Sequence, residues 1–343
     1  MGFMEIVLPL VVSFVITAAA GRLLIPALRR LKAGQSIKEI GPTWHMTKQG
    51  TPTMGGVMFI IGIGITILAL GWRHMMAGEF AHLYVYLFAL VFGAIGFIDD
   101  YQKVKHHHNT GLTALQKFAL QLAAAVAFLC LMRLEGLLTP NLYIPFWNTH
   151  LVLPWPVYLI FAAFVIVGTV NAVNITDGLD GLAILPCVMV GSALGIFAYV
   201  VGRPDYAQYL YFEYIRGACE LVVVCAALAG AGLAFLWFNC YPAQVFMGDV
   251  GALALGGALG TIAVITRQEI VLAIMGGIFV VETLSVMIQT TYFRLTHGKR
   301  VFLMAPIHHH FELKGWKETQ VVVRFWIITF VLVLIGLSTL KIR

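Results

Sequence analysis

The chain has 343 residues, of which 60% are hydrophobic and only 11% are charged, and its formal net charge at pH 7 is +6. Its mean hydropathy is +0.89. This composition excludes a soluble globular protein of ordinary type and indicates an integral membrane protein.

Long apolar segments follow one another along the whole chain. Because a membrane-spanning helix needs about 20 predominantly apolar residues, the sequence predicts an all-α fold with roughly ten transmembrane helices. We assign residues 1–343 to one polytopic membrane domain. The first segment has no basic region before it and no small-residue cleavage site after it, so we interpret it as a retained helix rather than a signal peptide. The expected spans are residues 5–28, 54–71, 82–98, 115–134, 155–173, 182–201, 218–238, 248–265, 268–290 and 321–340.

Basic residues are distributed unevenly between the two sets of loops. The odd-numbered loops hold 14 of the 22 lysines and arginines, so the positive-inside rule places these loops in the cytoplasm and both termini in the periplasm. Carboxylates are rare and costly where an apolar span meets the interface, and five of them on this side predict a polar active-site cleft at the cytoplasmic face. They are Asp99, Asp100, Asp177, Asp180 and Asp249.

The first loop ends in a run of glycines and hydroxyl residues at 48–56, just as the second span begins. Lys48, Thr53 and exposed glycine amides suit an anion, because backbone N–H groups at a helix start attract negative charge. The alternative is ordinary helix-start chemistry.

Asp99 and Asp100 are expected to close the third span, shortly before Lys103. Neighbouring side chains on a helix point about 100° apart, so we expect one acid to face the site and the other to support it. Paired acids can also push one pKa upward and create a proton acceptor. The alternative is a solvated helix end. We interpret the following run, His106–His108, as solvated loop.

The densest polar segment joins the fifth and sixth spans. Its amides and carboxylates recur at every third position, and on an α-helix they would form one polar stripe. Gly178 and Gly181 would end that helix and let a ligand approach the backbone. The alternative is a helix end with side-chain caps between two spans. The four polar residues are Asn171, Asn174, Asp177 and Asp180.

A second polar turn runs from Asn239 to Asp249, where the eighth span starts. Mg²⁺ prefers carboxylate oxygen and usually binds through one or two carboxylates plus substrate phosphates, so Asp249 with the other acids predicts a magnesium site. An N-cap role for Asp249 is the alternative. Phe246 offers either a flat face for stacking a base or an interfacial anchor.

Three consecutive histidines, His308, His309 and His310, lie in the ninth loop. Consecutive side chains cannot readily converge on one ion from a regular helix or strand, so we do not expect a zinc site. We interpret these histidines as donors to phosphate oxygens.

Five motifs together carry a family resemblance, and they cover the chain from the first loop to the C-terminus. They resemble phospho-N-acetylmuramoyl-pentapeptide transferase, the bacterial translocase I of the polyprenyl-phosphate N-acetylhexosamine-1-phosphate transferase superfamily. The acidic motifs are common to the superfamily, whereas the histidine loop with Glu-Leu-Lys-Gly-Trp after it is similar to the muramoyl-pentapeptide branch. One departure is the run His106–His108, where the family tends to carry more Lys and Arg. The motifs are Gly-Thr-Pro-Thr-Met-Gly-Gly at 50–56, Asp-Asp at 99–100, the polar run at 171–181, Phe-Met-Gly-Asp at 246–249 and Ala-Pro-Ile-His-His-His at 305–310.

The resemblance implies a Mg²⁺-dependent enzyme of the bacterial cytoplasmic (inner) membrane, with its active site facing the cytoplasm. It would transfer phospho-MurNAc-pentapeptide from UDP-MurNAc-pentapeptide to undecaprenyl phosphate, giving lipid I and UMP for peptidoglycan synthesis. The resemblance also suggests a homodimer, and we expect no nucleic-acid partner.

The resemblance further suggests roles for individual residues. Asp249 would hold Mg²⁺ on the diphosphate, Asp99 would accept a proton or orient the lipid phosphate, and Asp100 would support it. The other residues would bind nucleotide, sugar or phosphate groups. They are Lys48, Thr53, Lys103, Lys117, Asn171, Asn174, Asp177, Asp180, Asn239, Phe246, His308, His309 and His310.

Several alternatives stay open at this point. We favour direct attack by the lipid phosphate, and a covalent route through an Asp nucleophile is the other mechanism. A sister enzyme acting on another UDP-N-acetylhexosamine would share the chemistry and differ in the sugar pocket. A secondary transporter would also combine many spans with intramembrane acids, but the sequence has no internal repeat and its acids gather at one membrane face.

Overall fold

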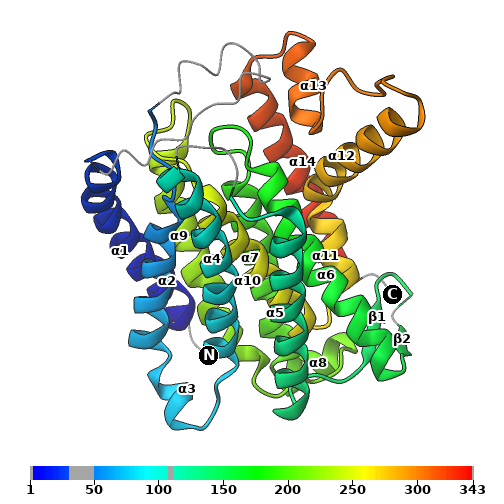
Figure 1. Cartoon of the computed structure of the whole chain (residues 1–343). Coiled ribbons are helices and arrows are strands. Elements are labelled where there is room, and N and C mark those ends of the chain that lie inside the picture. The colour runs from blue at the N-terminus through cyan, green and yellow to red at the C-terminus, as the bar shows by residue number, and fades with distance from the viewer. Residues whose placement is uncertain (1–2, 31–49, 107–110, 148, 342–343) are drawn as a thin grey trace.

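The computed structural model describes residues 3–30, 50–106, 111–147 and 149–341, which form a bundle of helices (Figure 1). The elements are α1 (Phe3–Arg30), α2 (Gly56–Leu70), α3 (Trp72–Met76), α4 (Ala81–His106), α5 (Ala114–Leu134), β1 (Asn141–Ile144), β2 (Thr149–Val152), α6 (Trp155–Thr176), α7 (Ile184–Val201), α8 (Pro204–Leu210), the 3-10 helix η2 (Ala218–Glu220), α9 (Leu221–Asn239), α10 (Gly248–Ile265), α11 (Glu269–Met275), α12 (Gly277–Leu295), α13 (Ile307–Leu313) and α14 (Glu318–Ser338).

The predicted all-α integral membrane protein is confirmed. Within the described ranges, eight helices are long and apolar enough to cross a membrane, namely α1, α4, α5, α6, α7, α9 with η2, α10 and α14. The chain is therefore a multi-pass membrane protein.

Two of the ten predicted spans differ from the expectation. The segment at 268–290 is not one straight helix, because α11 and α12 meet at Gly276 at an angle of 81°. Glycine lowers the cost of such a break, and the direction of a chain after a break is not encoded in its hydropathy. The segment at 54–71 forms α2, which has 15 residues and is shorter than the length of about 20 that a span usually needs.

Helix α10 lies at the centre of the bundle and packs against α4, α6 and α2. Small residues allow this close approach, as is common between membrane helices. A Cβ added to Gly56 of α2 would lie 2.2 Å from the Cα of Gly251, and one added to Gly96 of α4 would lie 2.2 Å from the backbone oxygen of Asp249. The first turn of α10 is thereby held directly against α2 and α4.

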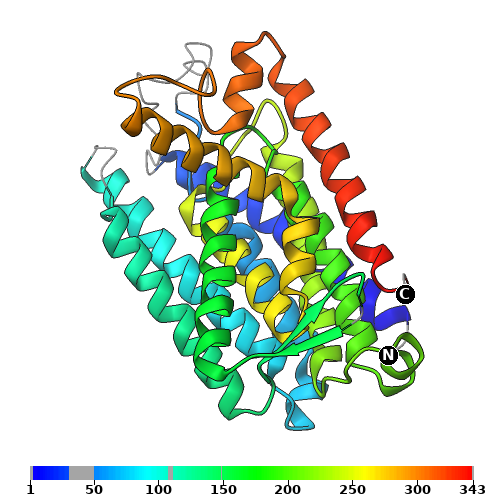
Figure 2. The ribbon, with the colours of Figure 1, turned by 90° about the vertical axis from the view of Figure 1, so that its right-hand side faces the viewer.

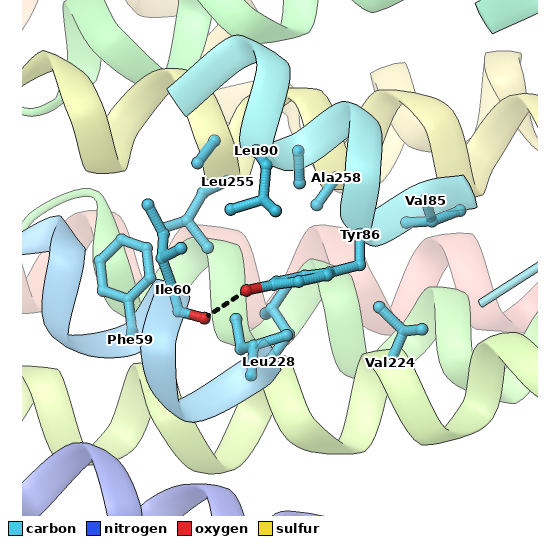
Figure 3. A pocket seen from close by; sticks show the side chains of 12 residues that line it. Phe59, Ile60, Val85, Tyr86, Leu90, Val224, Leu228, Leu255 and Ala258 are labelled. Carbon is cyan, nitrogen blue, oxygen red and sulfur yellow. Dashed lines mark hydrogen bonds between the residues drawn. The ribbon is translucent and has the colours of Figure 1, made fainter. Parts of the chain in front are cut away.

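A small apolar pocket lies deeper in the same bundle, between α2, α4, α9 and α10 (Figure 3). Phe59, Leu90 and Leu228 line it, and the Tyr86 hydroxyl beside it donates a hydrogen bond of 3.1 Å to the backbone oxygen of Ile60. The lining indicates a packing imperfection of the core rather than a polar binding site.

The two ends of the bundle are different. One end carries α13 and the turn between α6 and α7, and α12 leans away from the bundle at this end (Figures 1 and 2). The other end carries the antiparallel hairpin β1–β2, in which Asn141 pairs with Val152. The beginning of α1 and the end of α14 lie toward the hairpin end (Figure 2).

Candidate active site

Three carboxylates converge where α4 meets the first turn of α10. Asp99, Asp100 and Asp249 each offer one oxygen, and these oxygens lie within 4.8 Å of one another. Asp99 and Asp100 are buried, and the side chain of Asp249 is 17% exposed. The close packing of α4 on α10 thus brings together acids that are about 150 positions apart in the chain.

The two adjacent acids of α4 make different backbone contacts. The Val250 amide donates to Asp100 Oδ2 at 3.1 Å, so Asp100 fixes the start of α10. The Leu112 amide donates to Asp99 Oδ1 at 2.7 Å, so Asp99 fixes the segment that leads into α5. The other oxygen of each carboxylate is directed toward the lysines described next.

Two lysines bridge the carboxylates. Lys103 Nζ lies 2.6 Å from Asp99 Oδ2 and 2.9 Å from Asp249 Oδ2, and Lys117 Nζ of α5 lies 2.7 Å from Asp249 Oδ2 and 3.5 Å from Asp99 Oδ2. When all three carboxylates are ionised, they outnumber the two ammonium groups by one charge. The cluster can therefore accept additional positive charge.

Helix α4 continues beyond Asp99 and Asp100 to His106, so the helix is longer than the predicted span at 82–98. Lys103 follows Asp99 at the i, i+4 spacing that stabilises a helix by charge pairing. His107 and His108 lie outside the described residues.

The predicted polar stripe is interrupted. Helix α6 ends at Thr176, so Asp177 and Asp180 lie in the turn that follows it. Asn174 belongs to the cluster, since its Nδ2 donates to Asp249 Oδ1 at 2.8 Å. Asn171 is not brought to the cluster, because its Nδ2 donates to Gln121 Oε1 at 2.6 Å and to the Val167 backbone oxygen at 2.8 Å.

Asp177 is half-buried at the end of α6. Burial, together with the negative charges of Asp249, Asp100 and Asp180, raises the pKa of the Asp177 carboxyl to about 7. Asp177 therefore experiences the negative field of the cluster, and a cation bound nearby would favour its ionised form.

Asp180 and Asn239 connect two turns within the protein. Asp180 Oδ2 accepts from the Ala243 amide at 2.9 Å, and Asn239 Oδ1 accepts from the Gly181 amide at 3.1 Å. Asn239 Nδ2 also donates to the Val245 backbone oxygen at 2.9 Å. These contacts tie the turn after α6 to the turn before α10, and the substrate contacts expected of Asp180 and Asn239 stay predictions.

The segment after the first loop is paired with the segment before α10. Gly55 donates to the Phe246 backbone oxygen and Gly56 to the Met247 backbone oxygen, each at 2.9 Å, and Phe246 donates to the Pro52 oxygen at 2.8 Å. The protein backbone therefore already uses the amides of Gly55 and Gly56, so these two are not free for the anion that the sequence suggests at 48–56. The Phe246 side chain remains half-buried.

Thr53 lies beside the acids. A Cβ added to Gly248, whose φ is +73°, would lie 2.6 Å from Asp100 Oδ2 and 2.8 Å from Thr53 Oγ1. Glycine is required here both by the backbone conformation and by the closeness of these oxygens. Lys48 lies outside the described residues.

The three histidines of α13 have different partners. His308 Nδ1 lies 3.1 Å from Glu282 Oε2, and His309 Nδ1 lies 2.7 Å from Glu312 Oε2. The Leu303 amide donates to His310 Nδ1 at 3.1 Å, and burial, with the charge of Lys314, lowers the His310 pKa. The side chains diverge, as expected for neighbours on a helix, and His308 faces the turn after α6.

Sequence reasoning missed the partners of these histidines. Glu282 has a recognisable signal, because it is a carboxylate inside an apolar segment, where such a residue is costly and calls for a partner. Glu312 follows His309 at the i, i+3 spacing at which helix side chains meet.

Comparison with known proteins agrees with this geometry. The family model "Glycosyl transferase family 4" matches residues 82–267, which is more than half of the 343-residue chain. This match begins in α4 and extends just past α10, so it contains all three converging acids. The "Phospho-N-acetylmuramoyl-pentapeptide-transferase signature 1" matches residues 48–60, which include Thr53 and the start of α2. The chain therefore belongs to glycosyl transferase family 4, as a phosphoglycosyl transferase of the phospho-N-acetylmuramoyl-pentapeptide transferase type.

Proposed function

We propose that the enzyme transfers phospho-MurNAc-pentapeptide from UDP-MurNAc-pentapeptide to undecaprenyl phosphate, with lipid I and UMP as products. The observation that carries this proposal is the cluster of Asp99, Asp100, Asp249, Lys103 and Lys117 at the ends of membrane helices. One substrate is a soluble polyanion and the other is a lipid phosphate, so a charged site at the membrane edge suits both.

We also propose the setting of the reaction. The excess of lysine and arginine in the odd-numbered loops supports a cytoplasmic active site in the bacterial inner membrane. A homodimer is the oligomeric state that the family resemblance favours.

The three carboxylates fit a divalent cation, and we propose Mg²⁺. They offer hard oxygen ligands that already converge, and the negative charge in excess of the two lysines favours a cation. Asp249 is the primary ligand in this proposal, with Asp99 and Asp100 close enough to share the ion. When bound, Mg²⁺ would neutralise charge on the diphosphate.

In the proposed reaction, an oxygen of the lipid phosphate attacks the phosphorus that carries the sugar. A new P–O bond forms as the P–O bond to UMP breaks, and the electron pair leaves with UMP. A phosphate monoester has a second pKa near 6 and is largely dianionic at neutral pH, so the attack needs little base strength. Lys103 and Lys117 would stabilise the negative charge on the transferring group, and Asn174 would orient Asp249.

The contacts of the acids favour direct attack over a covalent aspartyl intermediate. Asp99 Oδ1 accepts from the Leu112 amide and Asp99 Oδ2 is paired with Lys103, while Asp249 Oδ2 contacts both lysines. Carboxylate oxygens engaged in this way are poor nucleophiles because their charge is already stabilised. In the direct route Asp99 orients the lipid phosphate or accepts its residual proton, and Asp100 supports it.

The test is a substrate comparison with purified enzyme in lipid. We expect UMP release and a lipid-linked muropeptide only when UDP-MurNAc-pentapeptide, a polyprenyl phosphate and Mg²⁺ are all present, and loss of both in EDTA. Release of UMP with UDP-N-acetylglucosamine and without a muropeptide would instead identify a sister enzyme. Release without the polyprenyl phosphate would contradict the transfer.

A further inference from the structure

A buried glutamate lies outside the acid cluster, in the helix that leans away from the bundle. Glu282 of α12 and His308 of α13 are both 0% exposed, and His308 Nδ1 lies 3.1 Å from Glu282 Oε2. A carboxylate in a membrane helix is costly and usually has a functional reason. Its partner is one of the three histidines of the motif at 305–310, and this contact fixes α13 on α12.

The other ring nitrogen of His308, Nε2, is directed at the turn that follows α6. A Cβ added to Gly178 would lie 2.4 Å from His308 Nε2, so this nitrogen faces the turn between Asp177 and Asp180. Among the described residues, the buried Nε2 has no hydrogen-bond partner. Buried polar atoms are nearly always hydrogen-bonded, and this one, beside the candidate site, is free to donate to a ligand.

We infer that Glu282 is a positioning residue that holds the His308 ring so that Nε2 is presented to a phosphate oxygen of a substrate at the Gly178 turn. This inference rests on the proposed function for the nature of the substrate. A carboxylate that accepts from Nδ1 fixes the orientation and hydrogen-bonding state of an imidazole. When both nitrogens carry hydrogen, Nε2 donates to the phosphate and the Glu282 carboxylate balances the positive charge of the ring.

The phosphate oxygen could belong to the nucleotide diphosphate or to the lipid phosphate, and kinetics separate the two. In Glu282→Gln, the amide can present its NH₂ group to Nδ1 and so favour the wrong orientation or tautomer. We expect kcat/KM to fall about tenfold or more, the range seen when an orienting partner of a histidine is removed. The KM for the substrate that His308 contacts rises, and the KM for the other substrate stays within about twofold.

The double variant separates positioning from folding. If Glu282 acts through His308, Glu282→Gln adds no further loss in a His308→Gln background, because the ring it orients is gone. Gly178→Ala tests the same ring from the opposite side, since its Cβ would displace Nε2 while leaving both partners in place. We expect Gly178→Ala to raise the KM for the substrate that His308 contacts. If Glu282→Gln does not fold, Gly178→Ala still tests whether His308 contacts a substrate.

The chain contains a matched control. Glu220 forms a second buried pair with a histidine, His82, whose Nδ1 lies 2.8 Å from Glu220 Oε2, and His82 Nε2 likewise has no partner within the described ranges. This pair joins α4 to η2, and α4 begins at the end of the bundle opposite α13 (Figure 1). Glu220→Gln should change neither KM nor kcat.

Binding of UDP-MurNAc-pentapeptide by isothermal titration calorimetry, and of a soluble short-chain polyprenyl phosphate, provides the same comparison without turnover. An inactive wild type that binds neither substrate would contradict the proposed function. Two results with an active wild type would overturn the positioning role alone. In the first, Glu282→Gln has the same kcat/KM as the wild type. In the second, Glu282→Gln lowers kcat/KM by the same factor whether His308 is present or replaced.

Discussion

Buried charges occur at both ends of the helical bundle, but they are arranged differently. Toward the hairpin end, Glu269 accepts from the Tyr158 hydroxyl at 2.5 Å, and Glu220 is paired with His82. Each of these carboxylates has its own partner from another element, which is the arrangement expected of a structural contact. At the other end, Asp99, Asp100 and Asp249 converge within 4.8 Å.

The difference indicates which end is built for a ligand. Like charges brought together repel one another and destabilise the fold, so a converging set is retained for a purpose other than stability. A buried carboxylate with a partner of its own, as at the hairpin end, does not face a second carboxylate and so has no such repulsion. Substitutions at the two ends should therefore separate activity from stability.

The largest effect is expected for Asp249→Asn. Removing the central carboxylate abolishes the proposed metal site, and UMP release should fall by about 10³-fold or more. The matched control is Asp205→Asn, because Asp205 is exposed and pairs only locally with Arg203 among the described contacts. Near-normal UMP release by Asp249→Asn would show that the convergence of acids has no catalytic meaning.

Lys117→Met should have the next largest effect. Lys117 contacts both Asp249 and Asp99, so its loss removes one positive group from the transferring phosphate, and we expect kcat/KM to fall about 10²-fold. The control is Lys105→Met, which changes an exposed lysine of α4. Equal kcat/KM values for Lys117→Met and Lys105→Met would show that Lys117 takes no part in the reaction.

Glu269→Ala, at the hairpin end, should lower stability and leave activity unchanged. The Tyr158 hydroxyl would lose its acceptor in a buried place, which costs about 1–3 kcal/mol of stability. We expect a lower thermal midpoint in detergent and unchanged kcat/KM at a temperature where both proteins are folded. A loss of activity without a loss of stability would mean that the hairpin end also takes part in the reaction.

The smallest effect is a pH dependence of stability that originates at Asp177. Its carboxyl has a pKa of about 7 in the folded protein against an ordinary value of 3.8, so the folded state binds the extra proton between these values. This contribution to stability is present at low pH and is lost as the pH rises through 7. The thermal midpoint should fall between pH 5.5 and pH 8.

Asp177→Asn should flatten that profile, because the amide does not ionise. Mg²⁺ should also stabilise the wild type more at pH 8 than at pH 5.5, since a cation favours the ionised acid. An unchanged slope in Asp177→Asn would assign the pH dependence to other groups.

The membrane helices and the acids were predictable from local sequence. Apolar length identifies helices such as α6 and α10, and a carboxylate such as Asp249 at the end of an apolar run signals a site because of its desolvation cost. A phosphate-binding role for Lys117 was suggested only by resemblance, and its contacts with Asp99 and Asp249 were not predicted, since its neighbours in the sequence do not reveal that α5 packs beside α4.

The remaining features depend on packing between distant segments. The angle between α11 and α12, the contact of Glu282 with His308, and the connection made by Asn239 each join residues whose relation is set by helix direction and rotation. Asn171 has the spacing that predicts a place in the site, but its side chain points toward Gln121 instead. Periodicity predicts which residues share a face, but it does not predict what that face meets.

The proposed catalytic role of Asp99, Asp100 and Asp249 is tested most directly by asking whether these carboxylates bind a divalent cation. Mn²⁺ can be titrated into the purified enzyme without substrates and followed by electron paramagnetic resonance, with Mg²⁺ as competitor. We expect the wild type and Asp205→Asn each to bind one Mn²⁺ that Mg²⁺ displaces, and Asp249→Asn to lose that binding. Equal Mn²⁺ binding by Asp249→Asn, or full activity of the wild type in EDTA, would contradict the proposed role.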